Sequence, residues 1–319
     1  MKKSFCISHV KDVDGIGAAA LVVAATGAEF ILADYDTLMD DLAKVPQDVS
    51  QFVLSDIGTD DSNRGAFVDR LGELATRCSV TYVDHHYLPP RAKLELAKRG
   101  VKVVHDPEEC ASMLCYSVFK DVLPPDARFI ALYGAVTDYQ DDSPMGLQMM
   151  EKADRQFVLA EATLLALALG RMGGRARFPE LLVRELAAMR MPHEIGKVPQ
   201  LALQQLKAET RLATEVREHG TKLGRLAYME TSQYSTGNVA KLLIGAFDVP
   251  VGVSYKEKQK GWVEVSLRST SECKIHLGQT IGRIALKLGG SGGGHRRAAG
   301  CHIRAAETKQ MVREVARLL

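Results

Sequence analysis

Several short apolar runs of this chain lead straight into aspartate or histidine. Residues 4–9 are followed by Asp12 and Asp14, residues 52–54 by Asp56, and residues 80–83 by Asp84-His85-His86, while Asp138 follows the longer apolar run 129–136. Open α/β sheets gather their functional groups at the carboxyl ends of their strands, so we expect these side chains to meet at one edge. Carboxylates crowded together there repel one another unless a cation lies between them. The pattern predicts a metal site.

Length, charge and cysteine usage narrow the class of protein. The chain has 319 residues, enough for two domains with their own cores. Its net charge of +2 is too small to hold long nucleic acids by bulk charge. Six scattered cysteines, with no Cys-x-x-Cys pair, are typical of reduced core residues. The first three residues are too short and polar for a signal peptide, and no apolar run approaches the roughly 20 residues of a membrane span. We therefore expect a soluble, cytoplasmic protein that does not contact membranes.

The order of apolar and amphipathic stretches predicts an α/β fold. Strand-like and helix-like stretches alternate up to about residue 145, which is typical of βαβ units. We predict an N-terminal parallel-sheet catalytic domain (1–190), a helical linker (191–225), and a smaller C-terminal α/β domain with a mixed sheet (226–319). In the last of these, strands are expected at 226–230, 249–256 and 262–269, and helices at 237–247, 280–288 and 306–319.

The acidic and histidine side chains form one candidate ligand set. It comprises His9, Asp12, Asp14, Asp56, His85 and Asp138. Carboxylate oxygens with imidazole suit Mn²⁺ or Mg²⁺ better than zinc, which tends to recruit thiolates. Each aspartate could instead only cap the helix after its strand, a common role for this residue. The gathering of so many titratable groups favours a functional site.

These residues carry a family resemblance. His9-x-x-Asp12-x-Asp14-Gly15, Ser55-Asp56-Ile57-Gly58, Asp84-His85-His86 and the segment from Gly134 to Asp138 resemble the four motifs of the DHH phosphoesterase superfamily. Gly292-Gly293-Gly294-His295, with Ala298-Ala299-Gly300, is similar to the signature of the companion domain in its RecJ-like branch. That branch includes RecJ-type exonucleases and the nanoRNase/pAp phosphatases.

The resemblance implies a role for each residue of the set. His9, Asp12 and Asp56 would hold one divalent ion. Asp14, Asp56, His85 and Asp138 would hold a second, with Asp56 bridging the two and Mn²⁺ preferred over Mg²⁺. Asp84 would fix the tautomer of His85, as carboxylates often do for metal-bound histidine. His86 would face the phosphate of the substrate.

The C-terminal domain supplies candidate substrate-binding residues. Consecutive glycines such as Gly293 and Gly294 let a backbone approach a ligand closely and offer N–H groups to a phosphate. His295 and Arg296 add cationic donors. Arg268 lies near the end of a predicted strand, where its guanidinium could bind a phosphate through two hydrogen bonds. The alternatives are a flexible glycine linker and an unliganded surface arginine.

Together these features predict a two-metal phosphodiesterase that hydrolyses short single-stranded oligonucleotides to mononucleotides. 3′-Phosphoadenosine 5′-phosphate is an additional candidate substrate, and the cleft between the two domains is the expected active site. A RecJ-like exonuclease on longer strands, a linear or cyclic dinucleotide phosphodiesterase, and a non-catalytic nucleic-acid-binding scaffold are the alternatives. A homodimer is also considered. Inorganic pyrophosphatases share the first four motifs but lack the glycine–histidine run.

Overall fold

The computed structural model describes residues 3–59, 63–172, 177–259, 261–294 and 296–319. Two compact units divide the chain, Met1–Leu206 and Lys207–Leu319, and the boundary between them falls within the long helix α10 (Val198–His219). None of the helices in these described ranges is long and apolar enough to cross a lipid bilayer.

The first unit is built on a five-stranded parallel sheet. Its strands lie in the order β2-β1-β3-β4-β5, and every pairing is parallel, which confirms the predicted α/β class. The strands are β1 (Ser4–His9), β2 (Glu29–Ala33), β3 (Gln51–Ser55), β4 (Ser79–Asp84) and β5 (Lys102–His105).

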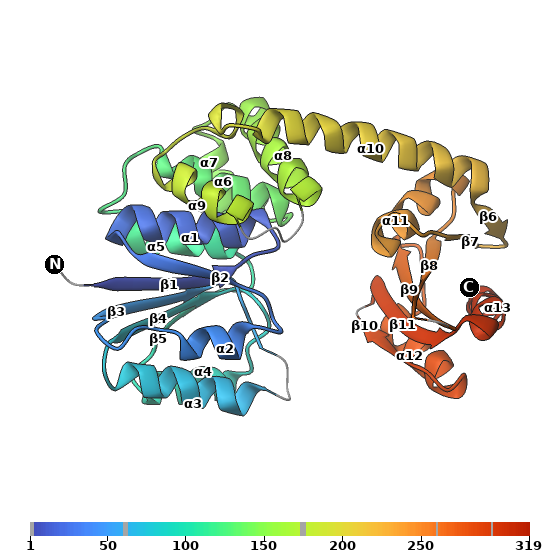
Figure 1. The fold of residues 1–319 in the computed structure, drawn as a ribbon, viewed down its shortest axis with the longest axis horizontal. Coiled ribbons are helices and arrows are strands. Elements are labelled where there is room, and N and C mark those ends of the chain that lie inside the picture. Colours follow the sequence, from blue (N-terminus) through green and yellow to red (C-terminus); the bar gives the residue numbers. More distant parts are fainter. Residues whose placement is uncertain (1–2, 60–62, 173–176, 260, 295) are drawn as a thin grey trace. The chain divides into compact units, whose positions relative to one another are not determined.

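Helices cover both faces of this sheet (Figure 1). One face carries α1 (Val13–Thr26), α5 (Ala111–Phe119), α6 (Ala127–Thr137), α7 (Pro144–Met150), α8 (Arg155–Met172) and α9 (Arg177–Ala187). The other carries α2 (Leu38–Ala43), α3 (Arg64–Ala75) and α4 (Pro90–Lys98). Because successive strand residues point to opposite faces, Cys6 of β1 joins the first core while Phe5 and Ile7 join the second. The strands are therefore apolar on both sides, as buried parallel strands usually are.

The chain reverses its direction across the sheet next to β1. The connection from β1 to β2 runs through α1 on one face, and the connection from β2 to β3 runs through α2 on the other. The carboxyl ends of the neighbouring strands β1 and β3 therefore flank a topological switch point, where doubly wound sheets open a crevice. The candidate ligands that follow these two strands lie at this position.

The second unit contains a mixed six-stranded sheet, as predicted. Its order is β10-β11-β9-β8-β7-β6, with β7 and β8 parallel and the other neighbours antiparallel. The strands are β6 (Thr221–Leu223), β7 (Leu226–Glu230), β8 (Val251–Gln259), β9 (Trp262–Ser269), β10 (Ser291–Gly294) and β11 (Ala298–Arg304). The helices are α11 (Thr236–Phe247), α12 (Leu277–Lys287) and α13 (Thr308–Arg317).

The glycine run forms the edge strand β10 and is not a flexible linker. Gly293 and Gly294 pair with Gly300 and Ala299 of β11. A methyl group on Gly278 of α12 would lie 1.9 Å from the carbonyl oxygen of Gly294, so the helix and this strand pack backbone to backbone. Part of the glycine content is therefore required for packing.

Candidate metal centre

The first ligand candidates come from the end of β1 and the start of α1. His9 is buried at the last position of β1, and Asp12 caps α1 by accepting the backbone N–H of Gly15 at 2.9 Å. The other oxygen of Asp12 lies 2.8 Å from Nδ1 of His9. Gly15 is required here because a β-carbon would fall 2.4 Å from the carbonyl oxygen of His9. Asp12 thus caps its helix and faces the candidate site at once.

Asp14 is held by a second helix. Its carboxylate is 1% exposed and accepts the backbone N–H groups of Ala111 at 2.7 Å and Ser112 at 2.8 Å, which are the first two residues of α5. The N-terminal end of a helix favours negative charge, so α5 stabilises this carboxylate in one orientation. Gly134 of α6 packs against the same carboxylate, since a β-carbon there would lie 2.5 Å from Oδ1 of Asp14.

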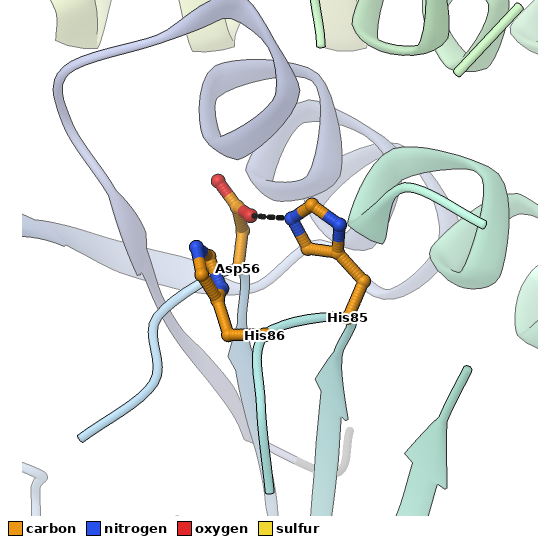
Figure 2. A group of neighbouring side chains, drawn as sticks. All are labelled: Asp56, His85 and His86. Atoms are coloured by element: carbon orange, nitrogen blue, oxygen red, sulfur yellow. Dashed lines mark ion pairs between the residues drawn. The ribbon is translucent and has the colours of Figure 1, made fainter. Parts of the chain in front are cut away.

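Asp56 lies at the centre of the group. It follows β3, is 2% exposed and has a backbone φ of 54°. Its Oδ1 lies 3.4 Å from Nε2 of His85, as Figure 2 shows, and its Oδ2 lies 3.7 Å from Nδ1 of His9. Backbone strain of this kind is concentrated at functional sites, where the surrounding structure holds it in place.

The remaining candidates gather with Asp56 and with one another in three overlapping sets. Nδ1 of His85 lies 3.6 Å from Oδ2 of Asp138, which follows α6. Ligand atoms lie within 4.8 Å of one another in three sets: His9 with Asp12 and Asp56, Asp14 with His85 and Asp138, and Asp56 with His85 and His86. The structure therefore brings together all six residues of the predicted ligand set. Their role as ligands stays a prediction.

Two buried atoms of this group have no hydrogen-bond partner, although each has a more distant charged neighbour. Nε2 of His9 and Oδ2 of Asp56 are inaccessible to solvent, and neither makes a hydrogen bond with any residue in the described part of the chain. Burial, together with the neighbouring carboxylates of Asp14 and Asp12, raises the pKa of Asp56 well above its usual range. Unpartnered buried polar atoms cost stability. A divalent cation would satisfy both atoms and offset the repulsion, so the donor set fits a metal.

Two other groups hold protons that a metal would displace. Burial lowers the pKa of His9, but the carboxylates of Asp12 and Asp56 outweigh it and raise that pKa to about 10. Burial and the charge of Asp14 raise the pKa of Asp138 to about 6. The site without metal is therefore partly protonated near neutral pH.

Asp84 contacts a different histidine from the one expected. Its Oδ1 lies 2.8 Å from Nδ1 of His86, and its Oδ2 accepts the hydroxyl of Tyr82 at 2.6 Å. Among the described contacts it makes no hydrogen bond with His85, so the expectation that Asp84 orients His85 is wrong. After β4 the imidazoles of His85 and His86 take different directions (Figure 2). That of His85 faces Asp56, whereas Nδ1 of His86 contacts Asp84.

Two further side chains of the site follow β2. Oδ1 of Asp34 lies 3.8 Å from Nε2 of His9, and its other oxygen pairs with Lys11 at 2.8 Å. The hydroxyl of Tyr35 lies 3.1 Å from Nε2 of His86. The sequence analysis missed both residues, although an acid directly after the apolar residues 30–33 is the same signal that identified Asp56.

The substrate-binding candidates of the second unit are neighbours. Arg268 lies opposite Ala298 across β9 and β11, and the backbone N–H of Ser269 donates to the carbonyl oxygen of Arg297. Arg296 is exposed, and its carbonyl oxygen accepts the backbone N–H of Leu277 at 3.0 Å. A β-carbon on Gly293 would meet no atom within 4 Å, so this strand residue borders open space. His295 lies outside the described residues.

Comparisons with known proteins agree with this architecture. Residues 225–319 match the DHHA1 domain family. No curated protein sequence matches the chain.

Among solved structures, a pGpG-specific phosphodiesterase, PggH from Vibrio cholerae, aligns with a TM-score of 0.63 and 15% identity over 99% of this chain and 98% of its own. RecJ from Thermus thermophilus, in complex with Mn²⁺, aligns with a TM-score of 0.64 and 19% identity over 99% of this chain and 52% of its own. An exonuclease RecJ bound to manganese aligns with a TM-score of 0.63 and 18% identity over 99% and 89% of the two chains. The C-terminal residues 225–319 thus match the DHHA1 domain family, and the chain as a whole shares its fold with the pGpG phosphodiesterase and RecJ structures.

Proposed function

We propose that this protein is a two-metal-dependent phosphodiesterase that hydrolyses short single-stranded oligonucleotides to mononucleotides. The observation that carries the proposal is the position of Asp56, whose two oxygens face two separate clusters of ligand atoms. His9, Asp12 and Asp56 would hold one ion. Asp14, Asp56, His85 and Asp138 would hold the other. Paired divalent ions supply a water nucleophile at neutral pH and stabilise the charge that develops on phosphate oxygens.

The protein's own side chains would orient the phosphate. The charge of Asp84 favours the imidazolium form of His86, and the hydrogen bond to Nδ1 leaves Nε2 to donate elsewhere. In the structure Nε2 contacts the hydroxyl of Tyr35, whose side chain is 49% exposed. A phosphate oxygen can take the place of this exposed partner. His86 would then act as a cationic donor to the transition state, positioned by Asp84.

The second unit would bind the nucleotide. The open space beside Gly293, the guanidinium of Arg268, which lies against Gly237 at the start of α11, and the exposed Arg296 support this role. His295 is proposed as a further donor on the strength of the sequence motif alone. Backbone N–H groups and arginines together suit a phosphodiester better than a neutral ligand.

A dinucleotide phosphodiesterase is the second candidate. The aligned pGpG-specific phosphodiesterase is matched over 98% of its length, whereas Thermus RecJ is matched over 52%. This supports linear dinucleotides among the substrates. A non-catalytic scaffold is disfavoured by the unpartnered buried atoms of His9 and Asp56, which cost stability unless an ion binds them.

A substrate panel with Mn²⁺ tests the proposal. It contains 5′- and 3′-labelled RNA and DNA from about 2 to about 24 nucleotides, 3′-phosphoadenosine 5′-phosphate, pGpG, cyclic dinucleotides and pyrophosphate. We expect the highest kcat/KM on the shortest oligonucleotides and no activity with chelator. A preference for the longest strands would support the RecJ-like alternative, and activity on pyrophosphate alone would overturn the proposal.

The role of the second unit has its own test. Arg268→Gln and Gly293→Ala should raise KM for a dinucleotide by about tenfold, while hydrolysis of bis-(p-nitrophenyl) phosphate stays near the wild-type rate. Gly245→Ala is the matched control, because a β-carbon there also meets no atom within 4 Å but lies on α11. Loss of both activities in Arg268→Gln would place this residue in the catalytic centre instead.

A further inference from the structure

A cavity of about 430 Å³ lies among the helices on one face of the first unit, apart from the metal-binding residues. Its walls come from the end of α5, the start of α6, and α7 with the residues after it. Three cationic side chains line it, together with one tyrosine and two methionines: Lys120, Arg128, Lys152, Tyr116, Met145 and Met149. Its volume is within the range of small-molecule sites.

The positive charge of this cavity is not compensated. No carboxylate lines it, and within the described ranges the side chains of Lys120, Arg128 and Lys152 make no hydrogen bond or ion pair. Nε of Arg128 is buried without a partner, and the guanidinium carbon lies 5.0 Å from the ring centroid of Phe129. Uncompensated guanidinium and ammonium groups around a cavity attract an anion, and arginine pairs with phosphate through two parallel hydrogen bonds.

A second cavity of the same unit shows the contrast. It measures about 480 Å³ and is lined by residues of α3 and α4, with cations of its own. There Arg99 pairs with Asp69 at 2.8 Å and with Glu95 at 3.4 Å. Two carboxylates line this cavity beside its three arginines, so most of its charge is offset within the protein and the demand for an anion is smaller.

The cationic cavity also has an apolar, polarizable part of its lining. Tyr116 on α5 and Met145 and Met149 on α7 line it. Methionine sulfur and tyrosine rings make favourable contacts with flat aromatic groups such as nucleobases. We propose that this cavity binds a phosphorylated small molecule of mononucleotide size, with its phosphate at Arg128 and the two lysines and its base against the methionines.

This site is distinct from the metal centre, and the proposal does not depend on the proposed function. Arg128 stands near the start of α6 and Asp138 follows its end, so about 15 Å of helix separates them. On α5 likewise, Ser112 at the start of the helix contacts Asp14, whereas Tyr116 lies in its second half and Lys120 caps its end. Each of the two helices therefore has one end at the metal-binding residues and the other at the cavity.

Methionine-methyl NMR of the full chain tests the proposal directly. Among the 11 methionines, the signals of Met145 and Met149 are assigned by Met145→Leu and Met149→Leu. In buffer with chelator, 5′-AMP should shift these two signals, inorganic phosphate should compete for the site, and adenosine should bind at least tenfold more weakly than AMP. Met229 and Met311 report on the second unit, so nucleotide binding there gives separate signals.

Charge variants identify the residues that recognise the phosphate. Arg128→Gln and Lys152→Gln should each weaken AMP binding about tenfold at Met145 and Met149, and Arg128→Lys should recover part of the loss. Lys102→Gln, on the exposed start of β5, is the matched control and should leave binding unchanged. Because Lys152 is exposed, its variant should fold even if Arg128→Gln does not.

Three outcomes would overturn the proposal. The first is that AMP leaves the signals of Met145 and Met149 unmoved. The second is that Arg128→Gln and Lys152→Gln, both folded, bind AMP as the wild type does. The third is that an oligothymidylate of about 8 nucleotides shifts both signals while AMP does not, which would make the cavity part of a nucleic-acid path.

Discussion

Oδ1 of the buried Asp84 carboxylate lies 2.8 Å from Nδ1 of His86. Its other oxygen accepts a hydrogen bond from the hydroxyl of Tyr82. Burial lowers the pKa of His86, but the hydrogen bond and charge of Asp84 outweigh it and raise the pKa above its ordinary value. Asp84 therefore favours the imidazolium form of its neighbour. The second histidine of the Asp-His-His motif is paired within the motif itself.

Asp84→Asn should move the alkaline limb of the pH–kcat profile to lower pH. The imidazolium of His86 is lost as pH rises through its raised pKa, and without Asp84 that pKa falls. Above the shifted limb we expect kcat to drop by about 10²–10³, the usual cost of losing a charged donor to the transition state. Tyr35→Phe leaves Asp84 in place and should keep the limb where it is. A limb unchanged in Asp84→Asn would contradict the role of His86, and loss of Mn²⁺ from His86→Ala would show that His86 is a metal ligand.

Asp56→Asn should stabilise the metal-free protein while removing its response to metal. A carboxyl whose pKa is raised on folding contributes stability below its unfolded pKa and loses it as pH rises through the folded value. At pH 8 with chelator we expect the free energy of unfolding of the variant to exceed that of the wild type by about 1–3 kcal/mol. Mn²⁺ should raise Tm only in the wild type.

Asp56→Ala is the control for backbone conformation at this position. Asparagine readily adopts the positive φ of 54° that this position requires, whereas alanine adopts it only at a cost in free energy. We therefore expect the alanine variant to be less stable than the asparagine variant. Equal stabilisation of Asp56→Asn and wild type by Mn²⁺ would show that Asp56 is not a ligand.

Metal binding at pH 7 should release protons. The pKa of His9 is raised to about 10, so this imidazole carries a proton that a metal must displace. Calorimetric titration of Mn²⁺ in buffers of different ionisation enthalpy should show release of about one proton or more, decreasing as pH approaches 10. His9→Gln should release fewer protons than the wild type. The same proton count in both proteins would exclude His9 from the ligand set.

Gly134→Ala should destabilise the first unit and weaken metal binding together. Its β-carbon would fall 2.1 Å from Oγ of Ser112 and 2.5 Å from Oδ1 of Asp14. Overpacking of this kind costs about 1–3 kcal/mol, measured by denaturant unfolding. Gly245→Ala, also within a helix but without neighbours, should instead be stabilising by about 0.5–1 kcal/mol. A stable Gly134→Ala with normal metal affinity would mean that α6 shifts easily at this point.

The strands that carry most of the candidate ligands were predictable from sequence. Residues 4–9, 52–54 and 80–83 are short stretches rich in apolar residues, and they lie in β1, β3 and β4. The edge strands β2 and β5 were not predicted, and they border less of the core than β3 does; Ala33 is the one buried residue of the two strands. Asp34 and Tyr35 were missed as a consequence. The apolar residues 30–33 were not recognised as a strand, so the acid at their carboxyl end was not included in the candidate site.

Other features depended on contacts distant in sequence. Four residues, Ser291–Gly294, have little intrinsic strand propensity and form β10 only because β11 and α12 accommodate them. Asp84 contacts His86 while the adjacent His85 faces Asp56 and Asp138, and these two partners of His85 are distant in sequence. The two hydrogen bonds from the start of α5 to Asp14 join residues that are separated by 97 and 98 positions in the sequence.

That last contact limits how the centre could be transplanted into a designed scaffold. A minimal copy built from the five strands would end at His105 and would retain His9, Asp12, Asp56 and His85. It would leave the Asp14 carboxylate without the two N–H groups that orient it, and it would lack Asp138. The smallest portable version of this centre therefore includes α5 and α6, so a designer has to treat roughly the first 140 residues as a single cassette.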